Sequence, residues 1–346
     1  KTSFLEILFL AVIFILAATY SFFIGSKGFA GFDLSPMISL AQSLHQGNGF
    51  HDFIDNPFSP GFALILKIFS QIFGGVNWNT FTLSVIFLSG ICIYTASYYH
   101  FKSNYSNKII FYAFFFGALI PLITDGHLYL HDASNVIAIF STFLLYVIIN
   151  NSYYEKYFSF SVIILALTLC LLVFMRGNTG LGFGIMNALM LIAWILIDSK
   201  ISLTKRLKII MYWIFLLAVF FYLLFYLMTY YISLDLSKYI SDLFAIASER
   251  TKIHGNIDTS LLTFSLLELK GFRQIEFSLY FIQILLLSVI LLELIVFTLM
   301  NKSTSAWFLS IFSFTFFLLA KNWEFVPIFF LTLLSISILI GYLKSK

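Results

Sequence analysis

Long apolar runs are the feature that most constrains the fold of this chain. A helix that crosses a bilayer needs about 20 predominantly apolar residues. Ten runs approach that length, at 4–24, 78–98, 109–124, 133–150, 158–175, 180–197, 209–231, 277–300, 305–320 and 326–343. Only 10% of the residues are charged, against about 25% in ordinary soluble domains. We therefore predict an all-α polytopic membrane protein with about ten spans, forming a single integral membrane domain over residues 1–346.

The basic residues predict which side of the membrane each connection faces. With the N-terminus inside, the connections 99–108, 151–157, 198–208 and 301–304 and the two chain ends carry eleven basic and two acidic residues. Cytoplasmic loops are enriched in Lys and Arg, so we predict that both termini are cytoplasmic. The two long connections, 25–77 and 232–275, are then external.

The connection 25–77 is predicted to hold two short helices that lie in the membrane interface. Residues 60–73 are apolar, but a helix of this length covers only about 21 Å of a hydrocarbon core about 30 Å thick. Ser59-Pro60 resembles a helix start, and one face is polar, with Lys67, Ser70 and Gln71. The preceding stretch is predicted to be a helix that starts at Ser35-Pro36 and ends at Gly47.

Asp33 stands immediately before the first of these helices and is the main candidate for chemistry. An acid between Phe32 and Leu34 at a membrane surface has the surroundings that raise a carboxyl pKa and allow it to act as a general base. The alternative is that Asp33 only caps the helix that follows.

A second external turn, residues 124–135, gathers Asp125, His127, His131 and Asp132. His127 and His131 have the i, i+4 spacing of two metal ligands on a helix, but no clear third ligand accompanies them. Asp132 could instead be the N-cap of the span at 133–150. We place these residues at an acceptor or secondary site.

Several basic residues are candidates for holding a phosphate at the external membrane boundary. Arg176 ends the span at 158–175 and is costly near hydrocarbon unless it is paired or snorkels to the interface. The other candidates are Lys67 on the interfacial helix, Arg250 in a charged run, and Lys321 near the start of the last span. The acidic residue Glu324 lies close to Lys321 in the sequence, and it could either act near the site or anchor the helix at the membrane interface.

The short internal connections leave no room for a nucleotide-binding domain, and no Walker or dinucleotide glycine pattern follows a strand. If the chain is an enzyme, its site faces outward. The activated group must then arrive attached to lipid.

Several segments resemble the GT-C superfamily of polyprenyl-phosphate-sugar glycosyltransferases. The first external loop of that family is similar to the order found here: a spanning run, GFD, a helix ending in QGNGF, and NPFSPGFALILKIFSQIFG. RGNTGLGF resembles the family's R-P-x-G-L-like start of a middle span, and KNWEFVPIFF resembles its late R-Y-x-x-P turn. The resemblance extends to the order of these segments and to the predicted membrane topology across nearly the whole chain. Ser59 replaces the usual second Pro, and Lys321-Asn322 replaces the Arg of the late turn.

The resemblance implies an inverting glycosyltransferase of the EC 2.4 class, in a bacterial inner (plasma) membrane. It would move a hexose or pentose from a polyprenyl-phosphate carrier to a cell-envelope glycan or lipid acceptor on the extracytoplasmic face. Membrane lipids are the other expected partners, and no nucleic acid is expected. Because Asp33-Leu34-Ser35 contains no second acid, we favour the metal-independent branch and expect no metal or other cofactor; a divalent metal is not favoured.

Two other functions remain open. The first is a transporter or flippase of lipid-linked sugars, which would show polar or charged residues within its spans. The clear acids inside spans are Glu6 and Glu293, both toward the cytoplasmic side. The second is a non-catalytic envelope-assembly subunit, which would tolerate loss of Asp33.

Overall fold

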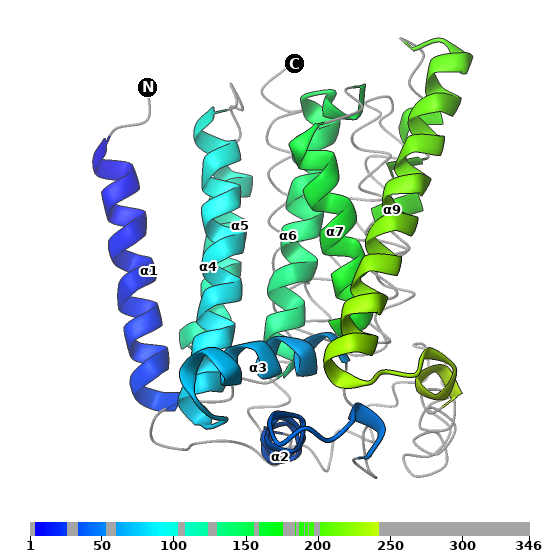
Figure 1. Ribbon diagram of the computed structural model, residues 1–346. Coiled ribbons are helices and arrows are strands. Elements are labelled where there is room, and N and C mark those ends of the chain that lie inside the picture. Colours follow the sequence, from blue (N-terminus) through cyan, green and yellow to red (C-terminus); the bar gives the residue numbers. More distant parts are fainter. Residues whose placement is uncertain are drawn as a thin grey trace, which may run out of the picture.

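The structure is a computed structural model that describes residues 4–25, 34–52, 60–102, 108–123, 130–155, 159–175, 184, 187–189, 191–192, 194–196 and 201–241. Every regular element in these ranges is a helix. The bundle consists of α1 (Phe4–Gly25), α4 (Trp78–Lys102), α5 (Lys108–Ile123), α6 (Leu130–Asn150), α7 (Phe160–Met175) and α9 (Leu203–Ile232). Two further helices, α2 (Leu34–His45) and α3 (Pro60–Phe73), lie across one end of it, and Figure 1 shows α3 against the bundle with α2 beyond it.

Within the described ranges, three helices are long and apolar enough to cross a membrane, at Phe4–Phe23, Asn79–Phe101 and Leu203–Ile232. The predicted spans at 109–124, 133–150, 158–175 and 180–197 correspond to shorter apolar helices. The spans predicted at 277–300, 305–320 and 326–343 lie outside the described residues. The chain is therefore compatible with a helical membrane protein, while the count of about ten spans stays a prediction.

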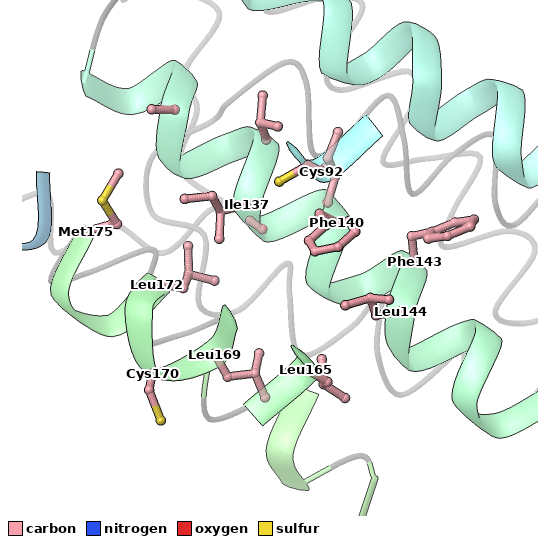
Figure 2. Close-up of a cluster of buried hydrophobic side chains, with 14 of the residues drawn as sticks. Cys92, Ile137, Phe140, Phe143, Leu144, Leu165, Leu169, Cys170, Leu172 and Met175 are labelled. Atoms are coloured by element: carbon pink, nitrogen blue, oxygen red, sulfur yellow. The ribbon is translucent and has the colours of Figure 1, made fainter. Parts of the chain in front are cut away.

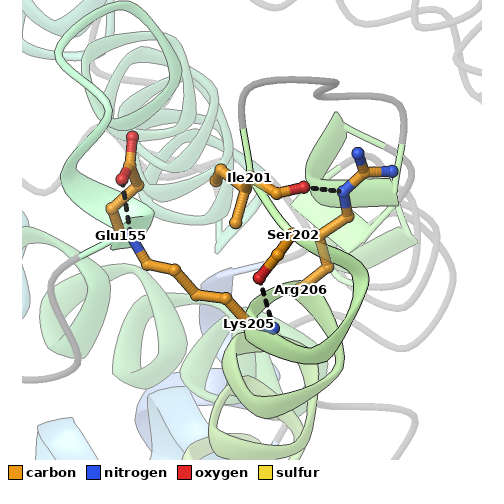
Figure 3. Close-up of polar contacts among 5 residues, drawn as sticks. All are labelled: Glu155, Ile201, Ser202, Lys205 and Arg206. Carbon is orange, nitrogen blue, oxygen red and sulfur yellow. Dashed lines mark hydrogen bonds and ion pairs between the residues drawn. The ribbon is translucent and has the colours of Figure 1, made fainter.

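The start of α9 differs from the prediction, which began this span at residue 209. Ser202 accepts a hydrogen bond from the backbone N–H of Lys205 at 3.4 Å and so caps the helix, as Figure 3 shows. Its cap satisfies an N–H group of the first turn that would otherwise lack a partner. Lys205 and Arg206 consequently belong to the first turns of α9, and Arg206 donates back to the carbonyl oxygens of Ile201 and Leu196.

Contacts between distant segments agree with the predicted alternation of connections between the two ends of the bundle. Lys205 forms an ion pair of 2.8 Å with Glu155, which follows α6 (Figure 3). The predicted internal connections 151–157 and 198–208 therefore lie at the same end. At the opposite end, the predicted external segments 25–77 and 232–275 meet, because the backbone N–H of Asp235 donates to Nε2 of His51.

The bundle core is centred on α6, which packs against α4, α5 and α7, while α7 also packs against α9. Figure 2 shows Ile137, Phe140 and Leu144 of α6 facing Leu165 and Leu169 of α7 in a cluster of buried apolar side chains. One face of α6 is polar although it is buried: it carries Ser134, Asn135, Ser141 and Thr142. The amide of Asn187 donates to Ser141 Oγ at 2.9 Å.

The helix α2 ends as predicted, at a glycine. Gly47 has a φ of +98°, a left-handed conformation that an L side chain rarely adopts. Its N–H bonds the carbonyl of Leu44 at 3.2 Å, and the N–H of Asn48 bonds the carbonyl of Ser43 at 3.1 Å. These two bonds form a Schellman motif, which satisfies carbonyls at the helix end and turns the chain toward Phe50.

The helix α3 has the predicted bounds, and one residue of its polar face, Ser70, is buried. Ser70 is fully buried and hydrogen-bonded, whereas the apolar residues Ile72 and Phe73 are exposed. Lys67, Ser70 and Gln71 were predicted only to share a polar face, and Ser70 is covered because α2 packs on α3 and His45 of α2 bonds to it. Periodicity identifies which side chains share a face, and tertiary packing decides what covers it.

The predicted orientation can be checked by labelling single cysteines from outside intact cells, after replacing Cys92 and Cys170 with Ala. We expect an impermeant maleimide to label Asn48→Cys and to leave Asn104→Cys unlabelled until the membrane is opened, because the positive-inside rule places residue 104 in the cytoplasm. Both variants are labelled after permeabilisation, which is the control. Outside labelling at position 104 and not at position 48 would overturn the orientation.

Candidate functional site

The chain topology attaches most of the predicted site residues to the end of the bundle that α3 crosses, called here the α3 end. At this end α1, α5, α7 and α9 finish, and α4 and α6 begin (Figure 1). Asp33 directly precedes the start of α2, Asp125 and His127 connect α5 to α6, and Arg176 directly follows Met175, the last residue of α7. These four residues themselves lie outside the described ranges, as do Arg250, Lys321 and Glu324.

The segment that carries His131 and Asp132 is helical, because α6 begins at Leu130. Asp132 therefore stands inside the first turn and is not the residue that precedes the helix, so its interpretation as the N-cap was wrong. A carboxylate in a first turn is still favoured by the helix dipole. Within the described part of the chain, no three His, Cys, Asp or Glu residues come together as a metal site would require.

Near the start of α3, the backbone of this helix lies close to the backbone at the end of α7. A methyl group added to Gly61 would lie 3.0 Å from both the carbonyl carbon and oxygen of Phe174, and 3.1 Å from the backbone nitrogen of Met175. Only glycine leaves enough room for this contact. The start of α3 is thereby fixed against the two residues that precede Arg176.

Lys67 is the predicted phosphate ligand whose side chain the structure describes. Its ammonium group donates to the carbonyl oxygen of Tyr231, in the last turn of α9. The C-terminal carbonyls of a helix carry partial negative charge, so a Lys there is attracted to the helix end. An ammonium has three N–H donors, and this bond uses one of them. Lys67 therefore joins α3 to α9, and its contact with a phosphate stays a prediction.

A second link joins the turn after α2 to the residues after α9. The backbone N–H of Asp235 donates to Nε2 of His51 at 3.0 Å, and the same ring nitrogen lies 3.1 Å from the carbonyl oxygen of Asp235. Gly49 allows this approach, since a methyl group there would lie 3.4 Å from Cβ of Ser233 and 3.0 Å from Oδ2 of Asp52. The QGNGF segment is thus a docking turn for the end of α9.

The residues after α9 are ordered by their own polar contacts. Asp235 Oδ1 accepts from the backbone N–H groups of Ser237 and Lys238, at 2.9 and 3.1 Å, and so caps the short helix 236–241. Tyr239 packs edge to face on Phe50, with ring centroids 6.3 Å apart. Burial raises the pKa of Tyr239 to about 12, because the charged phenolate is poorly solvated there. Its side chain is therefore neutral at physiological pH.

The sequence did not identify His51 or Asp235 as partners, because they are 184 positions apart and neither lies on an amphipathic helix. The glycines of QGNGF were the available signal, and they indicated a turn without indicating what it contacts. Comparison of the chain with protein-family models, with curated proteins and with solved structures found no match.

Proposed function

We propose that this protein is an inverting glycosyltransferase of a bacterial plasma membrane. It moves a monosaccharide from a polyprenyl-phosphate carrier to a cell-envelope glycan or lipid acceptor on the extracytoplasmic face. The observation that carries the proposal is the placement of α2 and α3, which follow α1 and lie together across one end of the helix bundle. This placement is the one expected from the GT-C-like order of the first loop, with Asp33 at the start of the layer.

The reaction needs one base and a stabilised leaving group. Asp33 takes the proton from an acceptor hydroxyl, whose oxygen forms a bond to the anomeric carbon as the bond from that carbon to the phosphate oxygen breaks. A polyprenyl phosphate leaves as an anion and needs no acid to protonate it. One carboxylate therefore suffices, unlike the two that glycoside hydrolysis uses. Attack from the face opposite the phosphate inverts the anomeric configuration.

Positive charge at the membrane boundary stabilises the departing phosphate. Arg176 is the main candidate, because a guanidinium offers several donors to phosphate oxygens, with Lys321 or Arg250 as further candidates. The contact of Gly61 with Phe174 and Met175 supports this choice, since it fixes the end of α7 beside the layer that begins at Asp33.

The proposal is tested by assaying transfer of labelled sugar to native envelope acceptors from a panel of polyprenyl-phosphate sugars. Soluble nucleotide sugars serve as the control donors, and we expect transfer only from the lipid-linked ones. Arg176→Ala should raise the donor KM by about tenfold or more, the scale of losing a charge-assisted hydrogen bond. Arg176→Lys should restore part of this loss, because it keeps the charge and loses the planar fork. Equal transfer from a nucleotide sugar, or an unchanged donor KM in Arg176→Ala, would contradict the corresponding half of the proposal.

One observation favours the alternative of lipid-linked sugar transport. The buried face of α6 carries Ser134, Asn135, Ser141 and Thr142, and the Oδ1 atoms of Asn135 and Asn187 have no hydrogen-bond partner among the described residues. Polar groups inside a membrane bundle are costly and commonly mark a substrate route. Reconstituted vesicles separate the two functions. A transporter moves the intact lipid-linked sugar across the bilayer without transferring the sugar to an acceptor. A transferase transfers the sugar to an acceptor without moving the lipid-linked sugar across the bilayer.

A further inference from the structure

The exposed face of α9 indicates where the hydrocarbon core of the membrane lies along this helix. Every exposed side chain between Lys208 and Tyr222 is apolar, whereas Lys208 is charged and three exposed tyrosines follow at one-turn intervals, at Tyr222, Tyr226 and Tyr230. Tyr is enriched where a membrane helix meets water. Lys208 and Tyr226 are about 27 Å apart at 1.5 Å per residue, close to a core thickness of about 30 Å. Lys208 therefore stands at one boundary of the hydrocarbon, and the tyrosines stand at the other.

Lys208 carries a positive charge that no acidic side chain in the described ranges neutralises. Its neighbour Lys205 forms the ion pair with Glu155, and Arg206 donates to backbone carbonyl oxygens, including that of Ile201 (Figure 3). Carbonyl groups are neutral, so the charge of Arg206 is also left without a counter-charge among the described residues. Two uncompensated positive charges consequently lie within the first two turns of α9.

Lys208 has a hydroxyl group and two apolar side chains as neighbours on the same exposed face of α9. Thr204 precedes Lys208 by four residues, so the two side chains are adjacent on the helix surface, and both are exposed. Leu207 and Met211 flank this pair and are 52% and 66% exposed. Helical side chains tilt toward the N-terminus of their helix. A lysine at this position can therefore reach past Thr204 toward water with its ammonium group, while its stem covers apolar surface.

This combination of side chains indicates the kind of ligand that fits. An ammonium group and a hydroxyl group both offer hydrogen-bond donors to the oxygens of a phosphate. The apolar side chains of Leu207 and Met211 favour a phosphate that carries hydrocarbon chains over one that is free in solution. The uncompensated charge favours a headgroup with a net negative charge, because a zwitterionic headgroup already contains its own cation.

We propose that Thr204 and Lys208 of α9 bind the headgroup phosphate of an anionic phospholipid, whose acyl chains lie against Leu207 and Met211. The bound lipid fixes the depth of α9 in the bilayer at this boundary. The site is independent of the proposed glycosyl transfer, because α9 begins at the end of the bundle opposite to α3 (Figure 1).

Lipid binding to the purified full chain tests this site. Native mass spectrometry from neutral detergent micelles measures the affinities for phosphatidylglycerol and for phosphatidylcholine with the same acyl chains. We expect the wild type to bind phosphatidylglycerol more tightly. Lys208→Gln should lower the phosphatidylglycerol affinity by about fivefold, the scale of one lysine near an anionic membrane surface, and leave the phosphatidylcholine affinity unchanged. Lys208→Arg should keep the wild-type preference, and Thr204→Val should weaken it by about two- to fivefold, the scale of one hydrogen bond.

A matched control is Lys238→Gln, which removes the same charge from an exposed lysine beyond the other end of α9 and should keep the wild-type affinities. The Lys208 variants should also keep the wild-type thermal midpoint in phosphatidylcholine, because this exposed side chain does not hold the bundle together. Equal affinities of the wild type for the two lipids, an unchanged preference in Lys208→Gln, or an equal loss in Lys238→Gln would overturn the inference. Displacement of the bound lipid by millimolar inorganic phosphate would overturn the assignment to a lipid, because a free anion has no acyl chains to contact Leu207 and Met211.

Discussion

Replacing Asp33 with Asn should lower the turnover of sugar transfer by about 10²-fold or more, the scale of losing a general base. The amide has nearly the same shape as the carboxylate but cannot take the proton from the acceptor hydroxyl. Donor binding should stay near normal, because the phosphate is assigned to basic residues. The measurement is the single-turnover rate of the purified variant at saturating donor and acceptor.

Two controls distinguish this base from a helix cap, since α2 begins at Leu34, the residue after Asp33. Asp33→Ser keeps a good N-cap but has no carboxylate, so it should be as slow as Asp33→Asn. Asp52→Asn alters another acid of the same loop, whose Oδ2 accepts from the backbone N–H of Gly49 at 2.6 Å, and should keep the wild-type turnover. Recovery of the wild-type rate in Asp33→Ser would show that Asp33 is only a cap.

Replacing Gly61 with Val should cost about 2–3 kcal/mol of stability, because a larger side chain has no room between α3 and the backbone of Phe174 and Met175. Gly61→Ala should lower the thermal midpoint by less. Transfer should fall along with stability, since α3 would move away from the end of α7. Thermal unfolding in detergent, followed by the transfer assay on the folded fraction, measures both effects.

A matched control for Gly61 lies in α5. A methyl group on Gly117 would meet only the end of the Ile139 side chain, at 3.2 Å, and a side-chain end can move where a backbone cannot. Both glycines are helical, so both alanine variants gain about 1 kcal/mol of helix propensity. We expect Gly117→Ala to be neutral or stabilising. A thermal midpoint for Gly61→Val equal to that of the wild type would contradict the close approach.

Sequence patterns predicted the elements that local physics determines. Apolar runs predicted α1, α4 and α9, the Pro at residue 60 predicted the start of α3, and Gly47 predicted the end of α2. The extension of α9 to Leu203 was missed, because the cap at Ser202 was hidden among basic residues that suggested a loop. These signals depend on interactions within one or two helical turns, so they can be read from the sequence without knowledge of the tertiary contacts.

The contacts between distant segments could not be predicted in this way. Periodicity placed Ser70 on a polar face, but only the packing of α2 on α3 shows that Ser70 is buried against His45. The bonds of Lys67 to Tyr231 and of His51 to Asp235 join segments that share no local pattern. For the candidate site, the sequence placed Asp33 and Arg176 next to helix ends. The up-and-down order of the helices in the bundle then brings these helix ends to the same end of the bundle.

The bonds that tie the layer of α2 and α3 to α9 also impose an order on biosynthesis. His51 and Asp235 are 184 positions apart, and a ribosome adding about 5–20 residues per second separates their appearance by about 10–40 s. During that interval the layer can already pack on α4 and then on α7, because α3 contacts both of these helices. The contacts of the α2 and α3 layer with α9 therefore form last, after α4, α5, α6 and α7 have been made.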